Sequence, residues 1–195
     1  MIYLKGLRRM MNKLKKGLII VDFDGTLYNT AKANREAYNE ALREYGYVID
    51  MKLFQKLYTG MHYLDFLPEI VDSSSMVEKV HNKKVEVYKN YYDSIEENTV
   101  LYDLLTGVKE EYYLVILTNA SRNNCIGVLR YFGKESFFDD IVTGDDVENR
   151  KPHNEGINKI LKKFQISEKN TLLIEDDVSN VNIPTIKSLV LYNFS

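Results

Sequence analysis

Carboxylate side chains directly follow two apolar segments of this sequence. Their residue types and spacing are suited to catalysis. Asp22 and Asp24 come directly after an aliphatic run, in "LIIVDFDGTL". Glu175, Asp176 and Asp177 come after a second such run, in "TLLIEDD". Of two carboxylates one residue apart, one can act as a nucleophile while the other moves protons. From the first pair alone, an ordinary turn capped by aspartate is an equally good interpretation.

Three further polar residues stand at comparable places. Thr118 and Asn119 end the run "YLVILTN", and Lys151 lies in the loop region before the acidic triplet. If all these residues meet, several carboxylates crowd around one ammonium group, and a divalent cation would relieve their repulsion. Oxygen ligands without His or Cys favour Mg²⁺ over zinc. Because Mg²⁺ commonly partners a phosphate, the set indicates phosphoryl transfer.

The segments that carry these residues have the pattern of strands in a parallel sheet. Short apolar runs begin near residues 17, 113 and 170, and strand patterns alternate with helical patterns after residue 110. This alternation predicts an α/β fold with a doubly wound, Rossmann-like parallel sheet. Ligands of such folds bind at the carboxyl ends of the strands, so we expect the polar residues to converge at that edge.

The chain also predicts an insertion in this fold. About 90 residues, mostly of helical pattern, separate the first two strands, and a βαβ crossover needs far fewer. We therefore expect a small α-helical cap at residues 30–95 and an α/β core at residues 17–29 and 96–195. Residues 1–16 form a basic leader with six Lys or Arg and no acid. This leader is either a helix that binds a membrane surface or an anion, or a frayed chain end.

Composition narrows the class of protein. The chain has 195 residues, of which 45% are hydrophobic, and a formal net charge of −2. The apolar fraction predicts a folded core, and the charge argues against nucleic acid as the main partner. The single cysteine, Cys125, excludes a disulfide within the chain and fits a reducing, cytoplasmic setting. The apolar run before Asp22 is too short to span a membrane or to form the core of a signal peptide.

Four segments, in order, resemble the motifs of the haloacid dehalogenase (HAD) superfamily of phosphatases and phosphotransferases. "DFDGT" at 22–26 matches the first motif and "LTNAS" at 117–121 the second. "RKPHNEGI" at 150–157 matches the third and "LIEDD" at 173–177 the fourth. The resemblance extends from about residue 17 over nearly the whole chain, and points to relatives of the β-phosphoglucomutase and phosphoglycolate phosphatase kind. Four ordered motifs are far more specific than the first one alone.

The resemblance implies roles for the residues of the first motif. Asp22 would be the nucleophile and a Mg²⁺ ligand. Asp24 would protonate the leaving oxygen and then activate water, and its backbone carbonyl would touch the metal. Gly25 would let the loop turn and let the substrate approach. Asp24 also separates this chain from the carbon–halogen hydrolases, which lack an acid there, and from the ion-pumping ATPases, which have threonine.

The other motifs would hold the phosphoryl group. The resemblance implies that Thr118 and the backbone amides around Asn119 and Ala120 bind its oxygens. Lys151 would neutralise both Asp22 and the phosphate.

The fourth motif would complete the metal site. Asp176 would be a Mg²⁺ ligand, with Glu175 or Asp177 as a further or water-mediated one. Many relatives carry another aspartate about four residues later, where this chain has Asn180.

The predicted cap holds a candidate substrate loop. "LYTGMHYLDF" at 57–66 resembles the cap loop that reads the substrate in β-phosphoglucomutase-like relatives, with Gly60 at its turn. His62 could meet a substrate hydroxyl or a second phosphate, and a packed histidine without such a role is the alternative.

These observations favour a Mg²⁺-dependent phosphatase that hydrolyses a small, soluble phosphorylated metabolite through an aspartyl-phosphate. A sugar phosphomutase of the β-phosphoglucomutase kind is the second interpretation. A phosphate-binding regulatory module without turnover is the third, and the complete set of motif residues argues against it.

Overall fold

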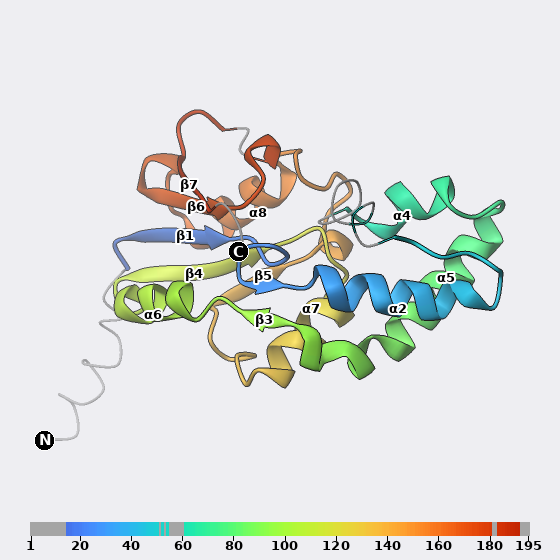
Figure 1. Ribbon diagram of the computed structural model, residues 1–195. Helices are drawn as coiled ribbons and strands as arrows, with labels where there is room; N and C mark the ends of the chain where they lie inside the picture. The colour runs from blue at the N-terminus through green and yellow to red at the C-terminus, as the bar shows by residue number, and fades with distance from the viewer. Residues whose placement is uncertain (1–14, 51, 53, 55–60, 181–182, 192–195) are drawn as a thin grey trace, which may run out of the picture.

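A five-stranded parallel sheet forms the centre of the protein (Figure 1). The computed structural model describes residues 15–50, 52, 54, 61–180 and 183–191. The strands lie in the order β5-β4-β1-β6-β7, and every neighbouring pair is parallel. The strands are β1 (Gly17–Val21), β4 (Tyr112–Leu117), β5 (Asp140–Val142), β6 (Thr171–Glu175) and β7 (Lys187–Val190). The predicted parallel α/β sheet is therefore confirmed.

Helices cover both faces of this sheet. Every residue of β1 is buried, as expected of a central strand whose two faces are both covered. Ile19 and Val21 pack in one apolar cluster with residues of α6 (Thr99–Val108) and α7 (Arg122–Tyr131). Leu18 and Ile20 point the other way, because strand side chains alternate, and pack with α8 (Glu155–Phe164). The core is thus doubly wound.

A separate group of helices lies beyond one end of the sheet, on the right of Figure 1. We call it the helical unit (residues 31–87). It contains α2 (Ala31–Arg43), α4 (Tyr63–Phe66), η1 (Leu67–Glu69) and α5 (Ser74–Val87). It has an apolar cluster of its own, formed by Tyr38, Ala41, Leu42, Ile49, Phe54, Phe66, Leu67, Val71, Val77 and Val80.

Short elements tie the helical unit to the core. After α5 the 3₁₀ segment η2 (Tyr88–Ser94) leads back, and β2 (Tyr28–Asn29) pairs antiparallel with β3 (Glu96–Glu97). This pairing brings the two ends of the intervening segment together. The division into a core at 17–29 and 96–195 and a cap at 30–95 stays a prediction. Of the leader at 1–16, only Lys15 and Lys16 lie among the described residues.

Local sequence explains where the helices begin. Ser73 accepts a hydrogen bond from the Met76 amide at 3.3 Å and caps α5, as its residue type predicts. Ser121 caps α7 in the same way through the Asn124 amide.

The remaining short turns are η3 (Gly144–Asp146), η4 (Glu168–Asn170) and η5 (Val178–Asn180). Within the described part of the chain, no helix is long and apolar enough to cross a bilayer.

Candidate active site

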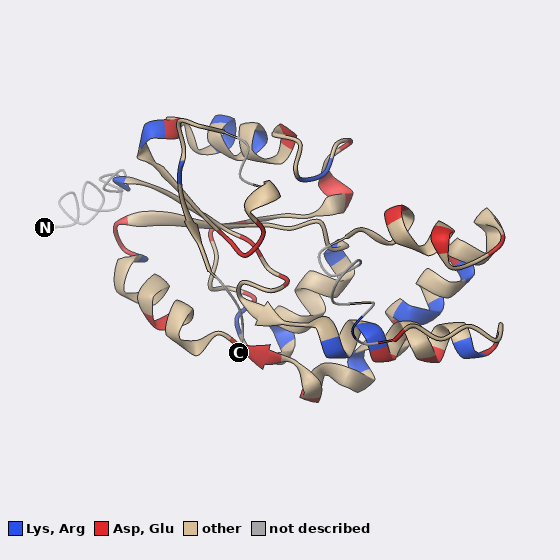
Figure 2. Ribbon diagram, turned by 45° about the horizontal axis from the view of Figure 1, so that its top comes forward, with Lys and Arg blue, Asp and Glu red and all other residues tan. Residues whose placement is uncertain are grey.

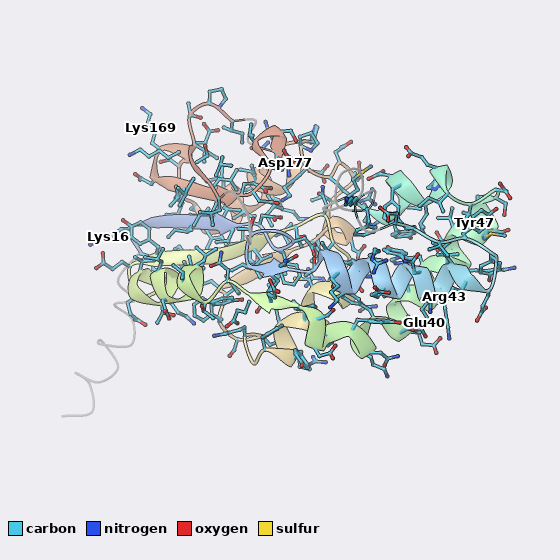
Figure 3. The ribbon with its side chains drawn as sticks, in the orientation of Figure 1. Lys16, Glu40, Arg43, Tyr47, Lys169 and Asp177 are labelled. Carbon is cyan, nitrogen blue, oxygen red and sulfur yellow. The ribbon has the colours of Figure 1, made fainter. Side chains whose placement is uncertain are left out.

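Residues of all four sequence motifs line one cleft at the carboxyl ends of β1, β4 and β6. This strand-end cleft has a volume of about 330 Å³ and is lined by Asp22, Asp24, Thr118, Lys151 and Asp176, among others. In Figure 2, acidic loop segments gather at the centre of the view, where the sheet meets the helical unit. Figure 3 shows Lys16 and Lys169 at the far end of the strands, away from Asp177. The four motifs therefore converge at one edge of the sheet, as the sequence predicted.

Lys151 joins two buried carboxylates. Its Nζ lies 2.5 Å from Asp22 Oδ1 and also donates to Glu175 Oε1. Burial, together with the Glu175 carboxylate, raises the pKa of Asp22 well above its usual range, and Lys151 opposes this. Burial would lower the pKa of Lys151, but the two carboxylates outweigh it and hold that pKa above its ordinary value. The ammonium therefore stays charged, in a site with more acids than bases.

Glu175 also shapes the loop after β6. Its second oxygen, Oε2, accepts hydrogen bonds from the backbone amides of Asp176 at 3.0 Å and Asp177 at 3.3 Å. Because its other oxygen accepts from Lys151, this fully buried carboxylate is occupied on both sides. Glu175 therefore positions both the Lys151 ammonium and the backbone of the turn after β6.

The acids of this site fit a divalent cation. Carboxylate oxygens of Asp22, Glu175 and Asp176 lie within 4.8 Å of one another. Burial and the Glu175 carboxylate raise the pKa of Asp176 to about 7. Three crowded carboxylates with one ammonium leave negative charge uncompensated, and an all-oxygen set of this kind suits Mg²⁺. Asp177 lies outside this trio, is exposed, and accepts from the Ser179 amide at 2.8 Å.

Gly25 makes room for the Asp176 carboxylate. Its φ is +88°, in the region that side chains rarely adopt, and a Cβ there would lie 2.2 Å from Asp176 Oδ2. Thr26 Oγ1 lies 3.4 Å from Asp176 Oδ1 and donates to it. The first-motif loop therefore packs directly against Asp176 of the fourth motif. The sequence alone did not predict this contact.

The second-motif loop is stabilised by an internal hydrogen bond, and it also fixes the backbone of the third motif. The Thr118 hydroxyl accepts a hydrogen bond from the Ala120 amide at 3.0 Å, which fixes the turn of this loop. That this amide binds the phosphoryl group stays a prediction. The Asn119 side chain clamps the backbone of Lys151: its Oδ1 accepts from the Lys151 amide at 2.9 Å and its Nδ2 donates to the Lys151 carbonyl at 3.1 Å. Asn119, expected near the phosphoryl group, thus positions the lysine.

Asp24 is held by a residue that sequence reasoning missed. The Thr30 hydroxyl donates a short hydrogen bond to Asp24 Oδ1. Burial raises the pKa of Asp24, and the Thr30 bond opposes this. Thr30 immediately precedes α2. Only its residue type, one that often precedes helices, could have marked it, and its hydroxyl serves Asp24 instead of the helix.

A second cavity lies beside the cleft, between the core loops and the helical unit. This inner cavity has a volume of about 40 Å³ and is lined by Asp24, Asn119 and Ser121 from the core and by His62, His81 and Lys84 from the helical unit, among others. Asp24 and Asn119 line both the cleft and the inner cavity. The structure therefore places His62 and Asp24 in the wall of one cavity, while Gly60 lies outside the described residues.

Comparison with known proteins agrees with the motifs. The family model of the haloacid dehalogenase-like hydrolases matches residues 19–183. Pyrophosphatase PpaX of Bacillus mycoides (strain KBAB4) is 28% identical over 175 residues, covering 84% of this chain and 76% of that protein. The phosphorylated carbohydrates phosphatase of Thermotoga maritima is 26% identical over 168 residues, covering 84% and 77%. The crystal structure of CbbY from Rhodobacter sphaeroides in complex with phosphate shares the fold, with a TM-score of 0.78 at 22% identity, covering 91% of this chain and 87% of that one.

Proposed function

The chain belongs to the haloacid dehalogenase-like hydrolase family and is a phosphatase, and we propose that it hydrolyses a small phosphomonoester with Mg²⁺ through an aspartyl-phosphate. The observation that supports this most is the position of Asp24, which lines both the strand-end cleft and the inner cavity. A group that protonates a leaving oxygen must stand between the phosphoryl group and the alcohol part of the substrate. The presence of Asp24 in the walls of both cavities supports this role.

In the first step Asp22 attacks. A carboxylate oxygen of Asp22 forms a bond to phosphorus, the bond from phosphorus to the alcohol oxygen breaks, and the Asp24 proton moves to that oxygen. Thr118 already accepts a hydrogen bond from the Ala120 amide, so its own proton can be donated to a phosphoryl oxygen. Lys151 balances charge on both Asp22 and the phosphoryl group, where the transition state gathers it.

In the second step water replaces Asp22. Asp24, now a carboxylate, takes a proton from water while the water oxygen bonds to phosphorus and the bond to Asp22 breaks. Inorganic phosphate leaves, and both aspartates return to their starting states. The hydrogen bond from Thr30 keeps the Asp24 carboxyl in place through both transfers.

Asp22 and Asp176 would hold Mg²⁺, with the backbone carbonyl of Asp24 and a carboxylate of the fourth motif completing its ligands. The bound ion would offset the negative charge of the phosphoryl oxygens and of the crowded acids. Asp22, Glu175 and Asp176 form the acidic group that supports this assignment.

The size of the inner cavity supports a compact substrate. A volume of about 40 Å³ has room for about three water-sized groups. That suits a short alcohol better than the hexose that a sugar phosphomutase must hold. A cytoplasmic location stays a prediction from composition.

A panel of phosphomonoesters tests this function. We expect release of phosphate from small alkyl phosphates with Mg²⁺ and loss of it with EDTA, and Asp22→Asn should abolish turnover. Activity that survives in Asp22→Asn would rule out the covalent step. Conversion of a hexose 1-phosphate to its 6-phosphate, faster than phosphate release, would favour the mutase instead.

A further inference from the structure

A buried lysine stands in the wall of the inner cavity. Lys84 is 1% exposed and belongs to α5. Its Nζ lies 3.6 Å from the ring centroid of Tyr88 and 5.1 Å from that of Tyr38. Among the described residues it has no ion pair with a carboxylate, and Asp24 is the acid that acts on it through space. Aromatic faces attract a cation only modestly, so an ammonium this deeply buried is poorly compensated.

Two buried histidines line the same cavity. His62 is 4% and His81 is 9% exposed, and His62 Nε2 and His81 Nδ1 have no hydrogen-bond partner among the described residues. His62 Nδ1 accepts from the Leu64 amide at 3.3 Å, which puts the proton of a neutral ring on Nε2 as a donor. Asp145 Oδ1 is 4.0 Å from that nitrogen, too far for a hydrogen bond.

The histidines are held in place by their neighbours. The ring of His81 stacks on Tyr63, with centroids 3.4 Å apart and planes 9° apart. His81 and Lys84 are three residues apart on α5, which puts their side chains on one face of the helix. The helical unit therefore places Lys84, His62 and His81 in the wall of a small space that Asp24 also lines.

We propose that Lys84, with His62 and His81, binds a carboxylate carried by the alcohol part of the substrate. This inference rests on the proposed function, since the alcohol part enters the inner cavity only if the phosphoryl group occupies the cleft. A carboxylate offers the countercharge that Lys84 lacks and accepts hydrogen bonds from the ring nitrogens. The inner cavity, with a volume of about 40 Å³, has room for such a group.

The test compares two substrates that differ only at the far end of a two-carbon alcohol. Phosphoglycolate ends in a carboxylate, and 2-hydroxyethyl phosphate ends in a hydroxyl group. For the wild type we expect a KM about 10- to 100-fold lower for phosphoglycolate, which is the usual worth of a hydrogen bond to a charged group. Lys84→Met should remove this preference, so that the KM values for the two substrates come within about twofold of each other.

A neighbouring lysine supplies the matched control. Lys83 is on the same helix and pairs with Glu86 at 3.3 Å, so Lys83→Met should change neither KM. Ethane-1,2-diol bisphosphate tests the other anion: a KM below that for phosphoglycolate would show that the subsite takes phosphate and would overturn the carboxylate assignment. An equal loss for both two-carbon substrates in Lys84→Met would also overturn it, because Lys84 would then act on the reacting groups.

Inhibition gives a readout that does not need turnover of either substrate. With p-nitrophenyl phosphate as the reporter, glycolate should inhibit the wild type competitively, ethylene glycol should not, and Lys84→Met should lose the inhibition by glycolate. If the wild type and Lys84→Met both hydrolyse the reporter but glycolate inhibits neither or both equally, this inference fails while the proposed function stands. If the wild type releases phosphate with Mg²⁺ neither from the reporter nor from the small alkyl phosphates, the proposed function itself fails.

Discussion

Lys151 and Asp22 are 129 positions apart in the sequence, and the Nζ of one lies 2.5 Å from Oδ1 of the other. Both side chains are only 6% exposed, and Glu175, also paired with this lysine, is fully buried. A buried cation between two buried acids stabilises the fold only while all three are present. The same contact thus couples the chemistry of the cleft to the stability of the core.

Loss of Lys151 should therefore reduce both the activity and the stability of the protein. We expect Lys151→Met to abolish phosphatase activity and to lower the free energy of unfolding by about 3–5 kcal/mol, because it leaves buried charge unpaired. Urea unfolding monitored by circular dichroism measures the second effect. The control is Lys163→Met, which breaks an exposed ion pair with Asp140 and should cost less than about 1 kcal/mol. Equal losses in the two variants would contradict the structural part of this argument.

The part assigned to Asp24 predicts a particular kinetic defect. p-Nitrophenolate needs no proton to leave, so Asp24→Asn should still form the aspartyl-phosphate from p-nitrophenyl phosphate but should hydrolyse it slowly. We expect a burst of about one p-nitrophenolate per enzyme in stopped flow, followed by a steady rate about 10²- to 10⁴-fold below that of the wild type. An alkyl phosphate should give no burst. A variant that turns over both substrates at wild-type rates would remove Asp24 from the mechanism.

Mg²⁺ binding should distinguish the two neighbouring aspartates of the fourth motif. Asp176 lies in the acidic group with Asp22, whereas Asp177 is exposed and outside it. Because a ligand that binds only the folded state raises its stability, Mg²⁺ should raise the Tm of the wild type. Asp176→Asn should lose most of this shift and Asp177→Asn should keep it, as measured by differential scanning fluorimetry. The reverse pattern would move the metal ligand to Asp177.

Much of the fold was visible in the sequence because apolar periodicity and strand-end chemistry are local signals. The run before Asp22 predicted β1. The contacts that hold the site together were not visible, since they join side chains distant in the chain. The Asn119 side chain clamps the backbone of Lys151, and no local pattern encodes this.

Lys84 is an intermediate case, because the sequence carries a local signal for its burial. Val77, Val80, Lys84 and Val87 recur at spacings of three and four residues, which is the buried face of a helix. A lysine on that stripe is a conflict between pattern and residue type, and such conflicts occur at functional sites. In the structure Lys84 is as buried as the three valines of this stripe.

Substitution of Gly25 tests the close contact between the first motif and the Asp176 carboxylate of the fourth motif. Gly25→Ala should cost the strain of a positive φ, about 1–2 kcal/mol, and should also push away the Asp176 carboxylate, which lies 2.2 Å from the new Cβ position. Gly46→Ala is the matched control, since Gly46 has a φ of +79° and nothing within 4 Å of a Cβ. We expect similar losses of stability from strain in both, but a raised Mg²⁺ requirement only in Gly25→Ala. An unchanged Mg²⁺ requirement would show that the loop adapts.

The two histidines of the inner cavity should make the protein sensitive to mild acid. Burial lowers the pKa of His62 to about 4 and that of His81 to about 3, against about 6.5 in an unfolded chain. Below pH 6.5 the unfolded state therefore binds protons that the folded state does not, so stability falls as the pH drops from about 6.5 towards 4. Each histidine contributes a slope of up to about 1.4 kcal/mol per pH unit. His81→Asn should flatten the pH dependence of urea unfolding, whereas Asn82→Gln, an exposed neighbour on α5, should not, and equal slopes in both variants would contradict the prediction.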